Sequence, residues 1–265
     1  RVASGEKGIA TPLVTPGTLE MKRVSEAIAR MATALEERAD YIDTFARGVS
    51  HEFKTPLASM RGAIELLNDH IDEMTPEERS RFLGNLEQDT ERLTRLVSRL
   101  ADLARADVVK PTEETCDAVA IIDEIITRFE KMGLHIELSN DGDAGLAPIK
   151  MARETFESII TNLVDNARQH GGQDVEVEVS ACRVEPVDHG PEMVAFSVRD
   201  NGPGISEANR KRVFDRFFTT ARNRGGSGLG LAIVKSLVSV HGGDITLVSE
   251  PGSTTFRFTL PTVQP

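Results

Sequence analysis

Residues 49–57 read VSHEFKTPL and place an ionisable ring beside a carboxylate, within a stretch of helical periodicity. His51 adjoins Glu52, and Pro56 follows five residues after the histidine. An imidazole can exchange a proton near neutral pH, and a neighbouring carboxylate can orient the ring or take its proton. A single surface histidine is usually only solvated, so this motif by itself is weak.

A second candidate is the glycine-rich stretch GGSGLG at 225–230, which directly precedes an apolar segment predicted to be helical over 229–240. Glycines let a backbone approach a phosphate, and a helix N-terminus favours anions. The stretch is neither a Walker A loop nor a dinucleotide fingerprint, because the spacing differs. A flexible hinge is the alternative, but the position at a helix start favours phosphate binding.

Three further motifs are weak when taken alone. DNGPG at 200–204 consists of turn residues that follow a predicted strand. Asn162 and Asn166 share one helix face, where side-chain amides could ligate a hard cation or bind phosphate, although such pairs are more often solvated. The aromatic cluster VFDRFF at 213–218 is typical of core packing.

The elements that would position His51 are long helices. Apolar residues alternate at spacings of three and four through residues 18–49, which favours a coiled coil or bundle over an ordinary amphipathic helix. After Val49 the seam shifts by four residues, and Pro56 cannot donate to the carbonyl of Glu52. We therefore expect a kink near residues 52–56, with His51 exposed on a bendable helix.

A polar turn at 72–77 ends the first long helix. Thr75 is predicted as an N-cap, with Glu78 completing a capping box, and a second apolar stripe follows through residues 82–103. Two such helices form a hairpin, which alone buries little apolar surface. The predicted architecture is therefore an all-α helical hairpin that forms a dimeric four-helix bundle from two copies.

The remainder of the chain is predicted to be an α+β sandwich with a mixture of hairpins and separate helices. A polar segment at 107–115 is taken as a linker. The expected helices cover 117–131, 152–170 and 229–240, and the expected strands cover 134–138, 174–184, 193–200, 244–250 and 254–261.

Composition limits the classes of function. The chain has 265 residues, which suggests about two domains. The net charge of −11 argues against nucleic acid as a partner, and two cysteines without a Cys/His cluster argue against zinc. No run of 18 apolar residues occurs, so the sequence contains no predicted membrane span.

Together, these stretches resemble a sensor histidine kinase of a two-component system over residues 40–262. SHEFKTPL is similar to the phospho-acceptor box, NLVDNARQH to the N box, DNGPGI and GGSGLGLAIVK to the two glycine boxes, and VFDRFF to the F box. The resemblance implies a HAMP-like relay helix over 1–40 and a dimerisation and phospho-acceptor domain over 41–106. The linker at 107–115 would then lead to an ATP-binding catalytic domain over 116–265.

The resemblance also implies residue roles in the phospho-acceptor domain. His51 would attack the γ-phosphate of ATP, Glu52 would assist, and Thr55 would help to dephosphorylate a response regulator. The implied activity is ATP-dependent autophosphorylation, followed by phosphotransfer to a response-regulator aspartate. The implied partners are a second copy in a homodimer and the response regulator. The piece would be the cytoplasmic portion of an inner-membrane protein, with a membrane sensor before Arg1.

In the ATP-binding domain the resemblance implies a Mg²⁺ ligand at Asn166, a nucleotide neighbour at Asn162 and a lid over 206–225. Gln169 stands where the family often has a basic residue, with Arg168 adjacent. The resemblance further implies that Asp200 reads the adenine and that Gly202 and Gly204 shape the pocket around it. The phosphate-facing stretch would comprise Gly226, Gly228, Leu229 and Gly230.

Two other functions are compatible with parts of the sequence. One is a dimeric scaffold that binds nucleotide only as a structural ligand, and the other is an ATPase without a phosphohistidine. The autokinase is favoured because His51, Glu52 and Thr55 accompany a complete set of nucleotide motifs.

Overall fold

The structure is a computed structural model that describes residues 19–106, 112–140, 146–172, 174–184, 191–221 and 226–263. The chain divides into two compact units, Arg1–Arg79 and Ser80–Pro265, here called the N-terminal and C-terminal units. Parts of the predicted relay helix (1–18), linker (107–111) and lid (222–225) lie outside the described residues.

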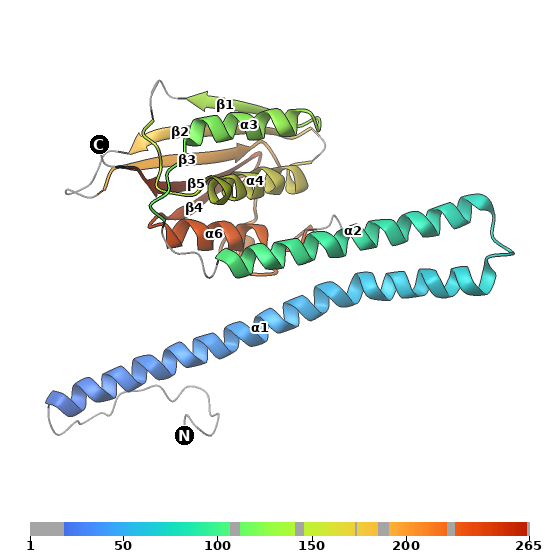
Figure 1. Ribbon diagram of the computed structural model, residues 1–265, viewed down its shortest axis with the longest axis horizontal. Coiled ribbons are helices and arrows are strands. Elements are labelled where there is room, and N and C mark those ends of the chain that lie inside the picture. The colour runs from blue at the N-terminus through green and yellow to red at the C-terminus, as the bar shows by residue number, and fades with distance from the viewer. Residues whose placement is uncertain are drawn as a thin grey trace. The chain divides into compact units, whose positions relative to one another are not determined.

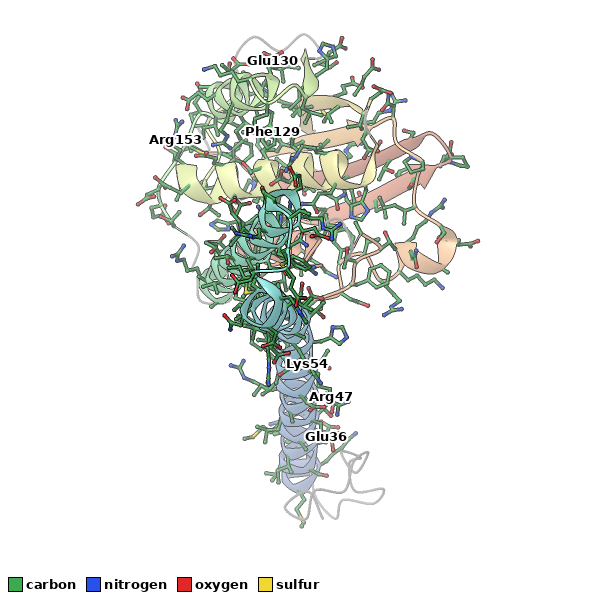
Figure 2. All side chains as sticks on the ribbon, turned by 90° about the vertical axis from the view of Figure 1, so that its right-hand side faces the viewer. Glu36, Arg47, Lys54, Phe129, Glu130 and Arg153 are labelled. Carbon is green, nitrogen blue, oxygen red and sulfur yellow. The ribbon has the colours of Figure 1, made fainter. Side chains whose placement is uncertain are left out.

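The N-terminal unit is dominated by α1, a single helix over Leu19–His70. Pro56 lies inside the helix and does not end it, so the helix continues beyond the residue that lacks a backbone donor. Charged side chains such as Glu36, Arg47 and Lys54 stand out along α1 (Figure 2). The apolar stripe predicted to face a second helix is exposed at Met21, Val24, Ile28, Met31 and Leu35.

The turn after α1 contains the predicted capping box. The backbone N–H of Glu78 donates to Thr75 Oγ1 (3.2 Å), and the backbone N–H of Thr75 donates to Glu78 Oε2 (2.9 Å). These reciprocal bonds satisfy two donors that a helix start otherwise leaves unpaired. The helix α2 begins here and covers Pro76–Ala106.

The C-terminal unit contains a five-stranded sheet in the order β1–β2–β3–β5–β4 (Figure 1). The β1–β2 pair is parallel, and the other neighbours are antiparallel. Helices α3, α4 and α6 cover one face of the sheet (Figure 1). The bounds are α3 Ala118–Glu130, β1 His135–Asn140, α4 Arg153–His170, β2 Glu176–Val184, β3 Met193–Asp200, α5 Glu207–Arg210, α6 Gly230–Val240, β4 Ile245–Glu250 and β5 Ser253–Pro261.

The core of this unit lies between the sheet and the three helices. Phe156 of α4 packs on Phe196 of β3, which stacks in turn on Phe258 of β5, with ring centroids 5.0 and 5.2 Å apart. Phe129 is buried on the side of α3 that faces α4, whereas the neighbouring Glu130 points away (Figure 2). Alternate residues of the strands therefore supply one apolar face, as their period of two predicts.

The predicted fold class is confirmed: a helical region precedes an α+β domain. The strand predicted over 193–200 is β3, and the helix predicted over 152–170 is α4, shorter by one residue at its start. No helix in the described part of the chain combines the length and apolar character needed to cross a membrane. The dimeric bundle stays a prediction.

Candidate active site

A cavity of about 540 Å³ in the C-terminal unit lies beside the end of β3. This volume is within the range of small-molecule sites. Its walls come from α4, the end of β3, the segment after β3 with α5, the segment before α6, α6 itself and β5. The lining residues are Asn166, His170, Asp200, Pro203, Gly204, Ile205, Ser206, Asn209, Val213, Phe218, Thr219, Thr220, Ala221, Leu231 and Thr254.

Asp200 is the last residue of β3, and its side chain is only 6% exposed. Its Oδ1 accepts a hydrogen bond from the backbone N–H of Gly202 (3.0 Å). Burial raises the pKa of the Asp200 carboxyl, and the hydrogen bond from Gly202 opposes part of that rise. A buried acceptor in a cavity wall is suited to bind a donor on a flat, largely apolar ligand.

The two glycines after Asp200 are required by close packing. A side chain at Gly202 would lie 2.7 Å from both Asp200 Oδ1 and the Cα of Gly171. Gly204 has a φ of +81°, and a side chain there would collide with the backbone carbonyl of Glu250. The interpretation of DNGPG as a turn is therefore correct as far as it goes, and the turn shapes the wall around Asp200.

A second, smaller cavity of about 40 Å³ adjoins the first, and Asn166 lines both. Asn162 lines only the smaller one, and its Nδ2 donates to the backbone carbonyl of Ser158 (2.8 Å). That bond leaves the Asn162 side-chain oxygen directed to Gly230, where a Cβ would approach it to 2.9 Å. The predicted sharing of one helix face by the two asparagines is confirmed.

The glycine stretch before α6 contributes Gly226, Gly228 and Gly230 to the smaller cavity. A side chain at Gly228 would meet the backbone of Phe217 at 2.5 Å, so this glycine also serves packing. The α6 helix starts without any side-chain cap, which leaves backbone N–H groups of its first turn available to an anion. Leu229 is fully buried and lines neither cavity.

Among the residues lining these cavities that sequence reasoning missed are His170 and Arg99. His170 lines both, and its Nδ1 lies 3.4 Å from the Thr220 hydroxyl. The sequence could have indicated His170, because this residue continues the four-residue spacing of Asn162 and Asn166 on one helix face. Arg99 of α2 lines the smaller cavity, and its only signal is a charged residue at helical spacing from Leu96.

The basic residue that the resemblance leads one to expect at position 169 is absent, since Gln169 stands there and the adjacent Arg168 is exposed. Gln169 lines the smaller cavity and carries no charge. Arg168 is exposed and pairs with Asp165, with Nη2 and Oδ1 3.0 Å apart. Gln169 therefore lines the smaller cavity, whereas Arg168 does not line it and pairs with Asp165 instead.

The predicted phospho-acceptor residues belong to the N-terminal unit. His51 is exposed on α1, as predicted, whereas Glu52 beside it is only 4% exposed. Thr55 is exposed one turn later, and its hydroxyl donates to the backbone carbonyl of His51 (3.4 Å). Consecutive helical residues point about 100° apart, so the different burial of His51 and Glu52 follows from helix geometry.

Two known families match successive parts of the chain. Residues 41–108 match the His Kinase A (phospho-acceptor) domain, and residues 151–264 match the family described as histidine kinase-, DNA gyrase B-, and HSP90-like ATPase. The chain therefore carries the two domains that sensor histidine kinases of two-component systems combine, a phospho-acceptor domain and an ATPase domain. Its C-terminal unit therefore carries the ATP-binding domain of that family, and the larger cavity lies in it.

Two curated relatives from mycobacteria are similar over most of the chain. A probable sensor histidine kinase TcrY from Mycobacterium tuberculosis is 34% identical over 95% of this chain and 53% of its own length. The signal transduction histidine-protein kinase/phosphatase MprB from Mycobacterium sp. strain KMS is 34% identical over 94% of this chain and 49% of its own length. The chain thus spans about half the length of these relatives.

Solved structures agree with the fold. Full-length ShkA in complex with AMPPNP has a TM-score of 0.56 at 28% identity, covering 82% of this chain and 45% of ShkA. The histidine kinase ThkA in complex with the response regulator protein TrrA has a TM-score of 0.67 at 22% identity, covering 86% of this chain and 64% of that one. The second likeness concerns the fold alone.

Proposed function

We propose that this chain is an ATP-dependent autokinase that phosphorylates His51 and passes the phosphoryl group to an aspartate of a response regulator. The observation that carries the proposal is the presence of two complementary parts in one chain. An exposed imidazole lies on a helix that matches a phospho-acceptor domain, and a cavity of nucleotide size with a buried acceptor, Asp200, lies in a matching ATPase domain.

In the proposed reaction a ring nitrogen of His51 attacks the γ-phosphorus of ATP. A nitrogen–phosphorus bond forms, the bond from that phosphorus to the bridging oxygen breaks, and ADP leaves. The proton on the other ring nitrogen is available to a base. Such transfers depend mainly on positioning and charge neutralisation, so the protein supplies an oriented nucleotide and an accessible nucleophile.

The proposal includes Mg²⁺, with Asn166 as its protein ligand. In the described residues, no three of His, Cys, Asp and Glu lie close enough to hold a metal ion by themselves. Asn166 lines both cavities, and its amide oxygen is the kind of hard ligand that Mg²⁺ accepts together with substrate phosphates and water. When bound there with the nucleotide, the ion would neutralise phosphate charge.

We extend the proposal to the partners. The exposed apolar stripe on α1 favours a second copy of the chain, which would give the dimeric four-helix bundle. A response-regulator partner is supported by the match of residues 41–108 to the phospho-acceptor domain, and phosphatase activity by the name of the MprB relative and by exposed Thr55. The membrane sensor expected before Arg1 stays a prediction.

Incubation with γ-labelled ATP and Mg²⁺ tests the autokinase. We expect label on the protein that survives alkali and is lost in acid, and no label on His51→Gln. His70→Gln is the matched control, because His70 is a second exposed histidine on the same helix. Free phosphate with an unlabelled protein would instead indicate an ATPase, and the absence of both products would indicate a nucleotide-binding scaffold.

A further inference from the structure

The Arg99 side chain reaches from α2 to the glycine stretch that lines the smaller cavity. Its Nη1 donates to the hydroxyl of Ser227 in the glycine stretch (2.9 Å), although the two residues are 128 positions apart in the sequence. Arg99 lines only the smaller cavity, together with Asn162 and Gly230. Both α2 from Ser80 onward and the glycine stretch belong to the C-terminal unit, so this contact lies within one unit.

The charge of Arg99 is incompletely compensated by the protein. Within the described residues, no carboxylate lies within ion-pairing distance of its guanidinium, and its one hydrogen bond goes to a neutral hydroxyl. Burial lowers the pKa of Arg99. The carboxylates of Asp165 and Asp102 oppose this shift, whereas the positive charges of Arg95 and Arg168 add to it. A partly buried cation without an adjacent anion is stabilised when an anion binds beside it.

The other groups around this cavity also favour an anion. The first turn of α6 has no side-chain cap, so its backbone donors and dipole add positive potential at Gly230 and Leu231, which line the cavity. Gln169 lines the same cavity and is neutral. Asp165 is the one carboxylate in this wall among the described residues, and it pairs with Arg168.

We propose that Arg99 binds the terminal phosphate of the nucleoside triphosphate and supplies the positive charge that Gln169 does not. This inference rests on the proposed function, in which the site holds ATP. Asp200 lines the larger cavity and Arg99 the adjoining smaller one, with Asn166 common to both. A nucleotide whose base lies beside Asp200 therefore directs its phosphate chain past Asn166 to Arg99.

Calorimetric titration of the full chain with ATP, ADP and adenosine, in the presence of Mg²⁺, tests the proposal. For Arg99→Met we expect the affinity for ATP to fall by about 10- to 100-fold, the range of a charge-assisted hydrogen bond. The affinity for ADP should fall less, and that for adenosine should not change. Arg99→Lys should recover part of the ATP affinity, because it restores the charge without the planar fork.

Arg95→Met is the matched control. Arg95 lies one turn earlier on α2, is exposed and pairs with Glu91, so its removal should lower the affinity for ATP far less than Arg99→Met does and should leave the affinity for adenosine unchanged. Equal losses for ATP and adenosine in Arg99→Met would overturn the proposal in favour of a structural role. Unchanged ATP binding in this variant would overturn it while leaving the autokinase intact, whereas a wild-type chain that binds no nucleotide would overturn both.

Discussion

Gly228 gives the sharpest test of how the glycine stretch is built. Its φ is +66°, a region in which an alanine is strained by about 1–2 kcal/mol. A Cβ would also lie 2.5 Å from the carbonyl carbon of Phe217 and 2.7 Å from the backbone nitrogen of Phe218. Backbone atoms cannot turn aside as a flexible side chain can, so the substitution adds overpacking of about 1–3 kcal/mol. Gly228→Ala should therefore destabilise the C-terminal unit by about 3 kcal/mol.

Gly252→Ala separates the two contributions. Gly252 has a φ of +87°, but nothing lies within 4 Å of a Cβ built on it, so only the conformational strain of about 1–2 kcal/mol applies. Urea unfolding followed by circular dichroism would measure both variants. With a urea dependence of about 2–3 kcal/mol per molar, the midpoint for Gly228→Ala should lie roughly 0.5–1 M below that for Gly252→Ala. Coincident midpoints would refute the packing argument.

Three further predictions concern titration, reactivity and capping. Because burial raises the folded-state pKa of Asp200, its contribution to stability is present at low pH and is lost as pH rises through that pKa. The stability of Asp200→Asn relative to the wild type should thus increase with pH, as urea unfolding from pH 4 to 8 would show. The variant should also lose nucleotide affinity in calorimetric titration. A stability advantage that grows as pH falls would contradict the first expectation. Burial raises the pKa of Cys116 to about 11, so at pH 8 only about one thiol in a thousand is ionised. A thiol reagent should therefore modify the half-buried Cys182 first, as mass spectrometry of digests would show, and modification of Cys116 first would contradict this. Thr75→Ala should cost about 1 kcal/mol of unfolding free energy in thermal denaturation, and no change would mean that the cap is dispensable.

The sheet and its helices were predictable because their signals are local. The segment 193–200 alternates apolar and polar residues, and β3 buries the alternate positions Val194, Phe196 and Val198. Likewise, the capping box at Thr75 and Glu78 depends on residues three apart, so a sequence pattern can express it. Local periodicity therefore suffices for the elements that carry the site.

The cavity walls were less predictable because they depend on contacts distant in sequence. The stretch DNGPG reads as an ordinary turn, and only the backbone of Glu250 explains why Gly204 must lack a side chain. Arg99 meets Ser227 only after α2 and the glycine stretch have packed together, a pairing that no motif spacing encodes. The glycine pattern accordingly predicts a phosphate site, which stays a prediction, but it expresses neither the close packing around Gly204 and Gly228 nor the contact of Arg99 with Ser227.

The wall between the two cavities is held by a strained backbone that the core stabilises. Phe217 has a φ of +61°, which is rare for an aromatic residue and costs of order 1–3 kcal/mol. Its side chain is buried, which contributes about 1.5–3 kcal/mol, and its backbone N–H donates to the carbonyl of Gly228 (2.8 Å). Burial and this hydrogen bond together offset the strain. The conformation of the F box and of the glycine stretch is therefore set by protein packing, so both Phe218 and Gly228 are already in position when a nucleotide arrives.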